Sequence, residues 1–373
     1  MAAFLSVPLA AFAGIRRIGE RWASASKITG LERKIKELLT KYKSAPDGVL
    51  FEILVALAYA EKGWNVELLE EKPPVKSPDM VVRKGGTEYF VECKRQERKG
   101  EYSEKERSEF LRLWDAAVPF LKANKQWVWL KATFHEEVSK LTTDFLAKIL
   151  ENSLPMKNRE ALVHQSDKAT IHARLIDPRV VLNHLEQFQV KCPSPMLNSL
   201  LGGDWAPSNS EVTVIGCVKM GHVIDCEAPV LGGFVQEMAW ASGITRKIDS
   251  EIAINKKARD ITKLLSKAVE QVPVDKPSII HIAAETLEGK DVELLRTNKV
   301  MSKISSFQID RHVIGIRFHR LQSNSRADKL FEFYETVEKF QRAHVLHKDI
   351  PSQVIVPINK KRLVEDIGKL RIK

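Results

Sequence analysis

The chain of 373 residues lacks several features that would assign it to a protein class directly. Its four cysteines form no C-x-x-C pair, which disfavours a thiolate zinc site, and their spacing does not indicate a disulfide framework. No apolar run is long enough to span a bilayer, and neither a G-K-[ST] phosphate loop nor a nucleophile elbow is present. These absences favour a cytoplasmic, reducing compartment and disfavour a transmembrane protein.

Charge of one sign is in excess. The chain has 59 lysines and arginines against 48 aspartates and glutamates, which gives a formal net charge of +11. Cationic surface attracts polyanions and speeds their encounter, so the balance favours nucleic acid as a partner. The alternative is a basic protein whose charges are only solvated.

Residues 1–45 are expected to form an N-terminal helical segment. Apolar side chains from Leu5 to Trp22 recur every three or four residues, which is typical of an amphipathic helix. We expect this helix to pack on the body of the protein. The alternative is a membrane or targeting role, because a small-residue stretch at 11–14 faintly resembles a cleavage site.

Residues 46–150 carry patterns in the order helix, three strands, helix, strand. The predicted elements are a helix at 49–62, strands at 64–69, 79–83 and 89–94, a helix at 103–123 and a strand at 126–133. A helix between two strands usually crosses over, so the last strand should lie parallel to an earlier one. The prediction is an α/β fold with a mixed central sheet flanked by helices.

The rest of the chain predicts a second α/β domain of unassigned fold. Residues 151–169 are polar and weakly patterned and are interpreted as a linker, with the second domain at 170–373. Its predicted helices include 250–272, 291–306 and 327–342. This half could recognise substrate, form a homodimer or bind another partner, and a cluster of basic residues at 246–267 offers candidate nucleic-acid contacts.

The most informative stretch is the predicted hairpin at 77–94. Gly85-Gly86 between two apolar runs indicates a tight turn. Glu92 and Lys94 share one strand face while Cys93 points to the other, and Asp79 begins the partner strand. Two carboxylates and an ammonium can therefore meet at one edge of a sheet, a set suited to a hard divalent cation and a phosphate.

Pro78-Asp79 followed by Glu92-Cys93-Lys94, with Glu52 in the preceding helix, resembles the PD-(D/E)XK nuclease superfamily, which has the restriction-endonuclease-like fold. The resemblance covers roughly residues 46–133. It implies an α-β-β-β-α-β core and Mg²⁺, with Mn²⁺ as a substitute, bound by Asp79 and Glu92. It further implies that the Cys93 carbonyl and Glu52 complete the metal site, and that Lys94 orients or activates the attacking water.

Several residues after the motif are candidate contacts to substrate. Gln96 would share the strand face of Glu92 and Lys94 and could bind the scissile phosphate. Basic side chains beside the motif could grip the phosphate backbone, and an aromatic ring could stack on a base; these are Arg95, Arg98, Lys99 and Tyr102. The alternative is a solvated, self-paired loop, because acids are interleaved with the basic residues.

Together these observations predict a metal-dependent nuclease, with DNA favoured over RNA because most members of that fold act on DNA. Each site residue also has a structural alternative: Asp79 as a turn acceptor, Glu92 and Lys94 as a solvated ion pair, and Glu52 as an exposed helix residue. At the level of the whole protein, the alternatives are a catalytically silent nucleic-acid-binding module and a scaffold.

Overall fold

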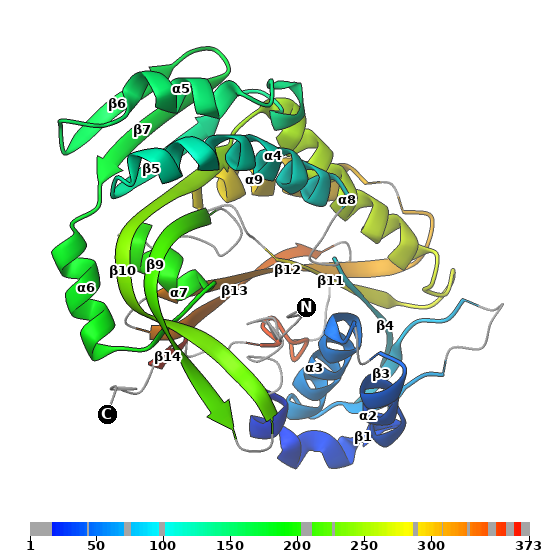
Figure 1. The fold of residues 1–373 in the computed structure, drawn as a ribbon. Helices are drawn as coiled ribbons and strands as arrows, with labels where there is room; N and C mark the ends of the chain where they lie inside the picture. The colour runs from blue at the N-terminus through cyan, green and yellow to red at the C-terminus, as the bar shows by residue number, and fades with distance from the viewer. Residues whose placement is uncertain are drawn as a thin grey trace.

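The structure is a computed structural model with two β-sheets (Figure 1). It describes residues 17–42, 45–70, 76–96, 101–202, 211–225, 228–285, 290–307, 309–326, 329–341, 348–355 and 362–366. The α/β class with mixed sheets and flanking helices is confirmed. Residues 1–16, which hold most of the expected N-terminal helix, lie outside the described residues.

The first sheet has eight strands in the order β1-β2-β3-β4-β11-β12-β13-β14. Both ends of the chain contribute to it. Strands β4, β11 and β12 run parallel, whereas β2, β3 and β4 pair antiparallel, as do β12, β13 and β14. The strands are β1 (Ile28–Thr29), β2 (Asn65–Leu68), β3 (Met80–Lys84), β4 (Thr87–Arg95), β11 (Ser278–Glu285), β12 (Val313–Arg326), β13 (Lys329–Gln341) and β14 (Arg362–Asp366).

The second sheet has six strands, with the order β6-β7-β5-β10-β8 and β9 paired to β10. Its strands β5 and β10 run parallel, and β5 and β7 run antiparallel. The strands are β5 (Val128–Phe134), β6 (Glu160–Gln165), β7 (Ala169–Leu175), β8 (Val190–Lys191), β9 (Glu211–Asp225) and β10 (Ala228–Ile248).

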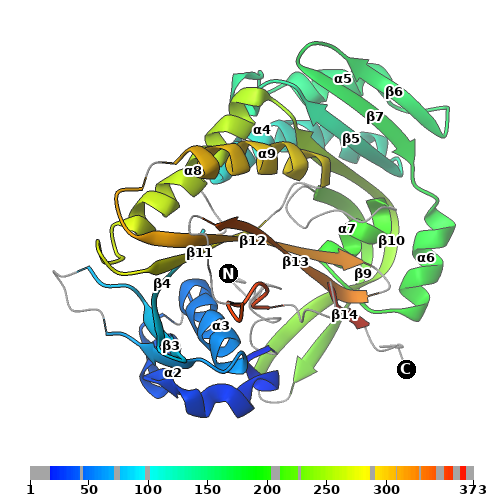
Figure 2. The ribbon, with the colours of Figure 1, turned by 180° about the vertical axis from the view of Figure 1, so that it is seen from behind.

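Helices cover both faces of the first sheet (Figures 1 and 2). α3 (Asp47–Glu61) packs in one apolar core with β2, β3 and β4, and α8 (Glu251–Val269) and α9 (Lys290–Ser306) pack on the other face of β11 and β12. α4 (Glu101–Asn124) packs on the second sheet. The remaining helices are η1 (Trp22–Lys27), α2 (Leu31–Thr40), η2 (Val138–Lys140), α5 (Phe145–Ser153), α6 (Pro178–Gln187) and α7 (Pro195–Gly202).

The local signals around the motif produce the expected elements. Gly85 and Gly86 have φ values of 55° and 78°, so both occupy the left-handed region that a two-residue hairpin turn needs. α3 ends at Glu61 and is followed by Gly63 with φ 86°, a left-handed residue that stops the helix. Nearly all of α3 is buried, so it forms the central layer of this half of the molecule.

The expectation that the strand at 126–133 lies parallel to one of the three earlier strands is wrong. Residues 126–133 do form a strand, β5, but β5 belongs to the second sheet. The position parallel to β4 is taken by β11, which follows α8. The reason is that α4 presents its apolar face, with Phe110, Leu113 and Trp114, to the second sheet and not to the first. Local patterns reveal such a face but not which sheet it covers.

Three further expectations differ from the structure. The linker at 151–169 contains β6, which pairs with β7, so the chain continues within the second sheet there. The helix expected at 327–342 is β13, an aromatic and β-branched stretch between β12 and β14. The helix expected from Ser103 begins at Glu101. No helix in the described part of the chain combines the length and apolar character needed to cross a membrane.

Candidate functional site

The motif residues meet where β3 begins and β4 approaches its end. Met80 of β3 pairs with Val91 of β4 in an antiparallel register. Asp79, one residue before Met80, is therefore opposite Glu92. This register brings the carboxylates together although 12 residues separate them in the chain. Hairpin geometry thus builds the centre of the site.

The two faces of β4 have different environments. Tyr89, Val91 and Cys93 belong to the core that packs on α3. Alternation places Glu92 and Lys94 on the other face, where their neighbours in β11, Ile280 and Ile282, contact α8. The expectation for this strand is confirmed. The Cys93 thiol lies in the apolar core, so only its main-chain carbonyl could serve a ligand in the site.

Hydrogen bonds fix the acids in place. The Cys93 N–H donates to Asp79 Oδ2 over 2.7 Å, and the strand register places the Asp79 and Glu92 carboxyl groups beside each other. Lys94 Nζ forms an ion pair with Glu92 Oε1. Glu92 is fully buried, which excludes the alternative of a solvated strand face. Asp79 does make a main-chain hydrogen bond, but across the hairpin and not within a turn.

Glu52 reaches the cluster from α3. Glu52 Oε2 forms an ion pair with Lys34 Nζ of α2, and the two atoms lie 2.6 Å apart. Both side chains are largely buried, so Glu52 is not an ordinary exposed helix residue. Sequence reasoning missed Lys34, because nothing in the charged pattern of residues 31–42 distinguishes it from the neighbouring lysines. Its burial depends on tertiary packing.

Burial and mutual repulsion raise the pKa values of all three acids. Burial, then the charge of Glu92, raises the pKa of Asp79 to about 8. Burial raises the pKa of Glu92 to about 7, and burial with the charge of Asp79 raises that of Glu52 to about 7. Burial alone would lower the pKa of Lys94, but the Glu92 and Asp79 carboxylates outweigh it, so the net shift is upward and Lys94 remains an ammonium.

The donor set suits a hard divalent cation. Among the residues that the structure describes, neither carboxylate oxygen of Glu92 has a hydrogen-bond partner, although Oε1 is ion-paired to Lys94. Buried carboxylate charge in this situation is costly, and a cation with oxygen ligands would offset it. Within the residues that the structure describes, no three His, Cys, Asp or Glu side chains form a ready-made cage. Asp79 and Glu92 would therefore be two ligands among waters and the Cys93 carbonyl.

The expected substrate contacts do not all lie at this cluster. The Arg95 side chain is 3% exposed and is held by Glu285 at 2.9 Å and Asp47 at 3.4 Å, so it acts as an internal clamp and not as a surface phosphate ligand. Gln96 continues beside β11, where its N–H donates to the Ala283 carbonyl over 2.7 Å. Arg98 and Lys99 lie outside the described residues.

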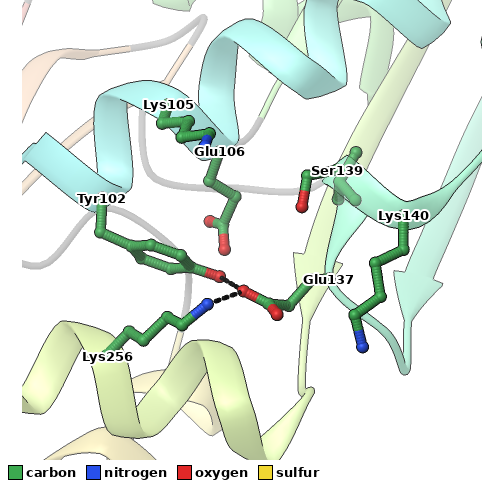
Figure 3. Close-up of a pocket in the computed structure, with 8 residues that line it drawn as sticks. Tyr102, Lys105, Glu106, Glu137, Ser139, Lys140 and Lys256 are labelled. Carbon is green, nitrogen blue, oxygen red and sulfur yellow. Dashed lines mark hydrogen bonds and ion pairs between the residues drawn. The ribbon is translucent and has the colours of Figure 1, made fainter.

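Tyr102 lines a separate small pocket of about 170 Å³ between α4, η2 and α8 (Figure 3). Its hydroxyl donates to Glu137 Oε1 over 2.9 Å, and Lys256 Nζ lies 2.6 Å from the same oxygen. Lys256 also lies over the Tyr102 ring, 5.2 Å from its centroid. No member of the Asp79 cluster lines this pocket, so the ring expected to stack on a base belongs to different surroundings.

A buried chain of polar side chains lies behind the site and was not expected from the sequence. Tyr59 Oη lies 3.2 Å from His281 Nε2, His281 Nδ1 lies 2.9 Å from His319 Nε2, and His319 Nδ1 lies 2.9 Å from Glu335 Oε1. The Glu335 carboxylate also accepts from the N–H groups of Val354 and Ile355. Each ring nitrogen of the two histidines therefore has a partner, and the chain ends at the Glu335 carboxylate.

The chain connects α3, β11, β12 and β13, and His281 is the register neighbour of Cys93. Burial, with the nearby His319 and Arg317, holds the pKa of His281 well below its usual range, so this imidazole is neutral in the folded protein. Only the fold brings these four residues together, because they are spread over more than two hundred positions of the sequence.

Tyr59→Phe should lower the free energy of unfolding by about 1–3 kcal/mol, because it leaves His281 Nε2 without a donor in the core. The ring would keep its packing on Trp64. Chemical denaturation at pH 7 measures the change. Tyr102→Phe is the control, since its hydroxyl lies in a solvent-accessible pocket, and a smaller loss is expected there. Equal losses in the two variants would contradict a special role for the buried chain.

Comparison with protein-family models, with curated proteins and with solved structures found no match to this chain.

Proposed function

We propose that the protein is a divalent-metal-dependent nuclease that hydrolyses phosphodiester bonds, with DNA favoured over RNA. The observation that carries the proposal is the convergence of Asp79, Glu92 and Lys94 at the ends of two neighbouring strands, with Glu52 supplied by the helix behind them. A structural role explains this cluster poorly, because three buried acids with raised pKa values are unfavourable for folding.

The side chains divide the work. Asp79 and Glu92 would hold Mg²⁺ or Mn²⁺, which when bound supplies positive charge to the scissile phosphate and makes water more acidic. Lys94 is 23% exposed, so its ammonium can reach a phosphate oxygen at the surface while it remains paired with Glu92. The ion pair with Lys34 holds the Glu52 side chain in place beside the cluster and partly neutralises its negative charge.

The arrangement of elements also supports the proposal. Around the site the order is α3, β2, β3, β4, α8 and β11, with β11 parallel to β4. This is the α-β-β-β-α-β order that the motif's resemblance implies, with the residues between β4 and α8 forming the second sheet as an excursion. The order of these elements supports the proposal, although the last helix and strand differ from those expected.

Plasmid cleavage tests the proposal. Purified protein is incubated with supercoiled plasmid, linear duplex, single-stranded DNA and RNA, in Mg²⁺, Mn²⁺ or EDTA. Cleavage should require the cation and should fall by at least about 100-fold in Lys94→Ala, because the ammonium that faces the phosphate is lost. Glu88→Gln is a matched control on the same strand, since Glu88 is an exposed partner of Arg83. Binding without cleavage of any substrate would favour the catalytically silent alternative.

A further inference from the structure

The outer surface of α8 carries a basic stripe. Arg259, Lys263 and Lys267 are all exposed and recur every four residues, so they lie on one side of the helix. At 1.5 Å per residue the stripe is about 12 Å long. Asp260 is the one acid among residues 256–269, and it is only half-exposed beside Arg259.

These three charges differ from the other basic residues of the same region. Lys256 is committed to Glu137 at 2.6 Å, and Lys257 is buried against Glu106. Arg246 is buried with its guanidinium 4.7 Å from the Phe110 ring centroid. By contrast, Arg259, Lys263 and Lys267 make no ion pair within the part of the chain that the structure describes. The structure therefore divides a cluster that looks uniform in the sequence into internal partners and an open stripe.

The helix that carries the stripe packs next to the acidic cluster. α8 packs on the face of the first sheet to which Glu92 and Lys94 point, as the contacts of Ile280 and Ile282 show. The helix ends close to the segment that leads into Asp79. There Glu270 forms an ion pair with Lys76, and Gln271 Nε2 donates to the Ser77 carbonyl over 3.5 Å.

The hydrogen bond and charge of Lys76 lower the pKa of the Glu270 carboxyl group at this same end of the helix, with smaller contributions from the charges of Arg311 and Lys267. α8, whose outer side carries the basic stripe, therefore lies over the sheet face that bears the site, and Glu270 and Gln271 just beyond the stripe contact the segment that leads into Asp79.

We propose that the α8 stripe of Arg259, Lys263 and Lys267 binds the phosphate backbone of nucleic acid beside the cleavage site. This inference rests on the proposed function and names the surface that holds the substrate. Each strand of a duplex presents one phosphate per 3.4 Å of axis, so a stripe of about 12 Å spans three or four phosphates. Contacts to phosphates position the substrate without reading its sequence, so binding along α8 is independent of base sequence.

The experiment measures binding and not cleavage. Fluorescence anisotropy follows a labelled duplex of random sequence in EDTA, with the Lys94→Ala protein as the parent so that no strand is cut. The triple variant Arg259→Gln, Lys263→Gln, Lys267→Gln should bind about 100-fold more weakly at 50 mM salt. The slope of log affinity against log salt should become less negative by about 3, one for each lost phosphate contact.

The control is Lys36→Gln, Lys157→Gln, Lys168→Gln, which removes the same charge from exposed positions away from α8. Its affinity should stay within about twofold of the parent. Equal losses in the two triple variants, or no duplex binding by the parent, would overturn the inference. So would loss of binding to anionic lipid vesicles without any effect on the duplex. The increase in Tm of the wild-type protein with Mn²⁺ is measured separately. It tests the acidic cluster independently of the result on α8.

Discussion

Asp79→Asn should abolish metal-dependent cleavage and, at the same time, make the metal-free protein more stable at pH 8. Asn keeps an oxygen that can accept from the Cys93 N–H, so the hairpin contact survives. It removes a buried carboxyl group that repels Glu92. We expect a gain in the free energy of unfolding on the order of 1–3 kcal/mol at pH 8, measured by denaturation in EDTA.

The raised pKa of Asp79 determines how the stability of the folded protein changes with pH. Burial and Glu92 raise the pKa of Asp79 to about 8, from an ordinary value of 3.8. The folded protein therefore holds a proton that the unfolded chain releases above about pH 4. The stability from this group is fully present below pH 4 and is lost as the pH rises toward 8. Wild-type protein in EDTA should thus lose stability between pH 5 and pH 8, and Asp79→Asn should lose less.

A divalent cation should offset the loss of wild-type stability at pH 8. Mn²⁺ should raise the Tm of the wild type at pH 8, because a ligand that binds only the folded state stabilises it. The same concentration should leave the Tm of Asp79→Asn nearly unchanged. Glu88→Gln, on the same strand, should respond like the wild type. A variant that is less stable than the wild type in EDTA at pH 8, or that responds fully to Mn²⁺, would contradict the assignment of Asp79.

Glu106→Ala should destabilise the protein by about 3–5 kcal/mol, the largest effect expected from a single substitution outside the apolar cores. Glu106 on α4 and Lys257 on α8 lie 2.6 Å apart, and both side chains are 2% exposed. Removal of Glu106 takes away the ion-pair partner of the buried Lys257 ammonium. Chemical denaturation at pH 7 measures the loss.

The double variant Glu106→Leu, Lys257→Met removes both charges and should recover most of the stability, since an apolar pair of similar size avoids the desolvation cost. Glu251→Ala is the control. Glu251 pairs with Lys299 at 3.2 Å, but their side chains are 76% and 45% exposed, so a change of less than about 1 kcal/mol is expected. A small effect of Glu106→Ala would show that water reaches the buried pair.

Local signals predicted the hairpin and the helix before it, because their causes lie within a few residues. Gly85 and Gly86 set the turn, and alternation along β4 set which side chains meet. The identity of the strand beside β4 could not be predicted in this way. It depends on whether α4 or α8 covers the first sheet, and the two helices carry similar apolar faces.

The same distinction applies to the site. Asp79, Glu92 and Glu52 follow from the motif, whereas Lys34 depends on how α2 packs beside α3. Arg95 has the residue type and position of a phosphate contact, but Glu285 on β11 buries it, and β11 lies far along the chain. Charge clusters read from sequence cannot separate a side chain with an internal partner from one that faces solvent.

The long separation between β4 and its neighbour β11 affects biosynthesis. A growing chain that has already released the motif hairpin still lacks the strand beside it until residues 278–285 have been translated. Until then the β4 edge has unpaired main-chain groups, which favour mispairing or aggregation. All members of the acidic cluster are translated by residue 94, but the strand beside them comes late, and a fragment that ends at residue 150 would expose this edge permanently.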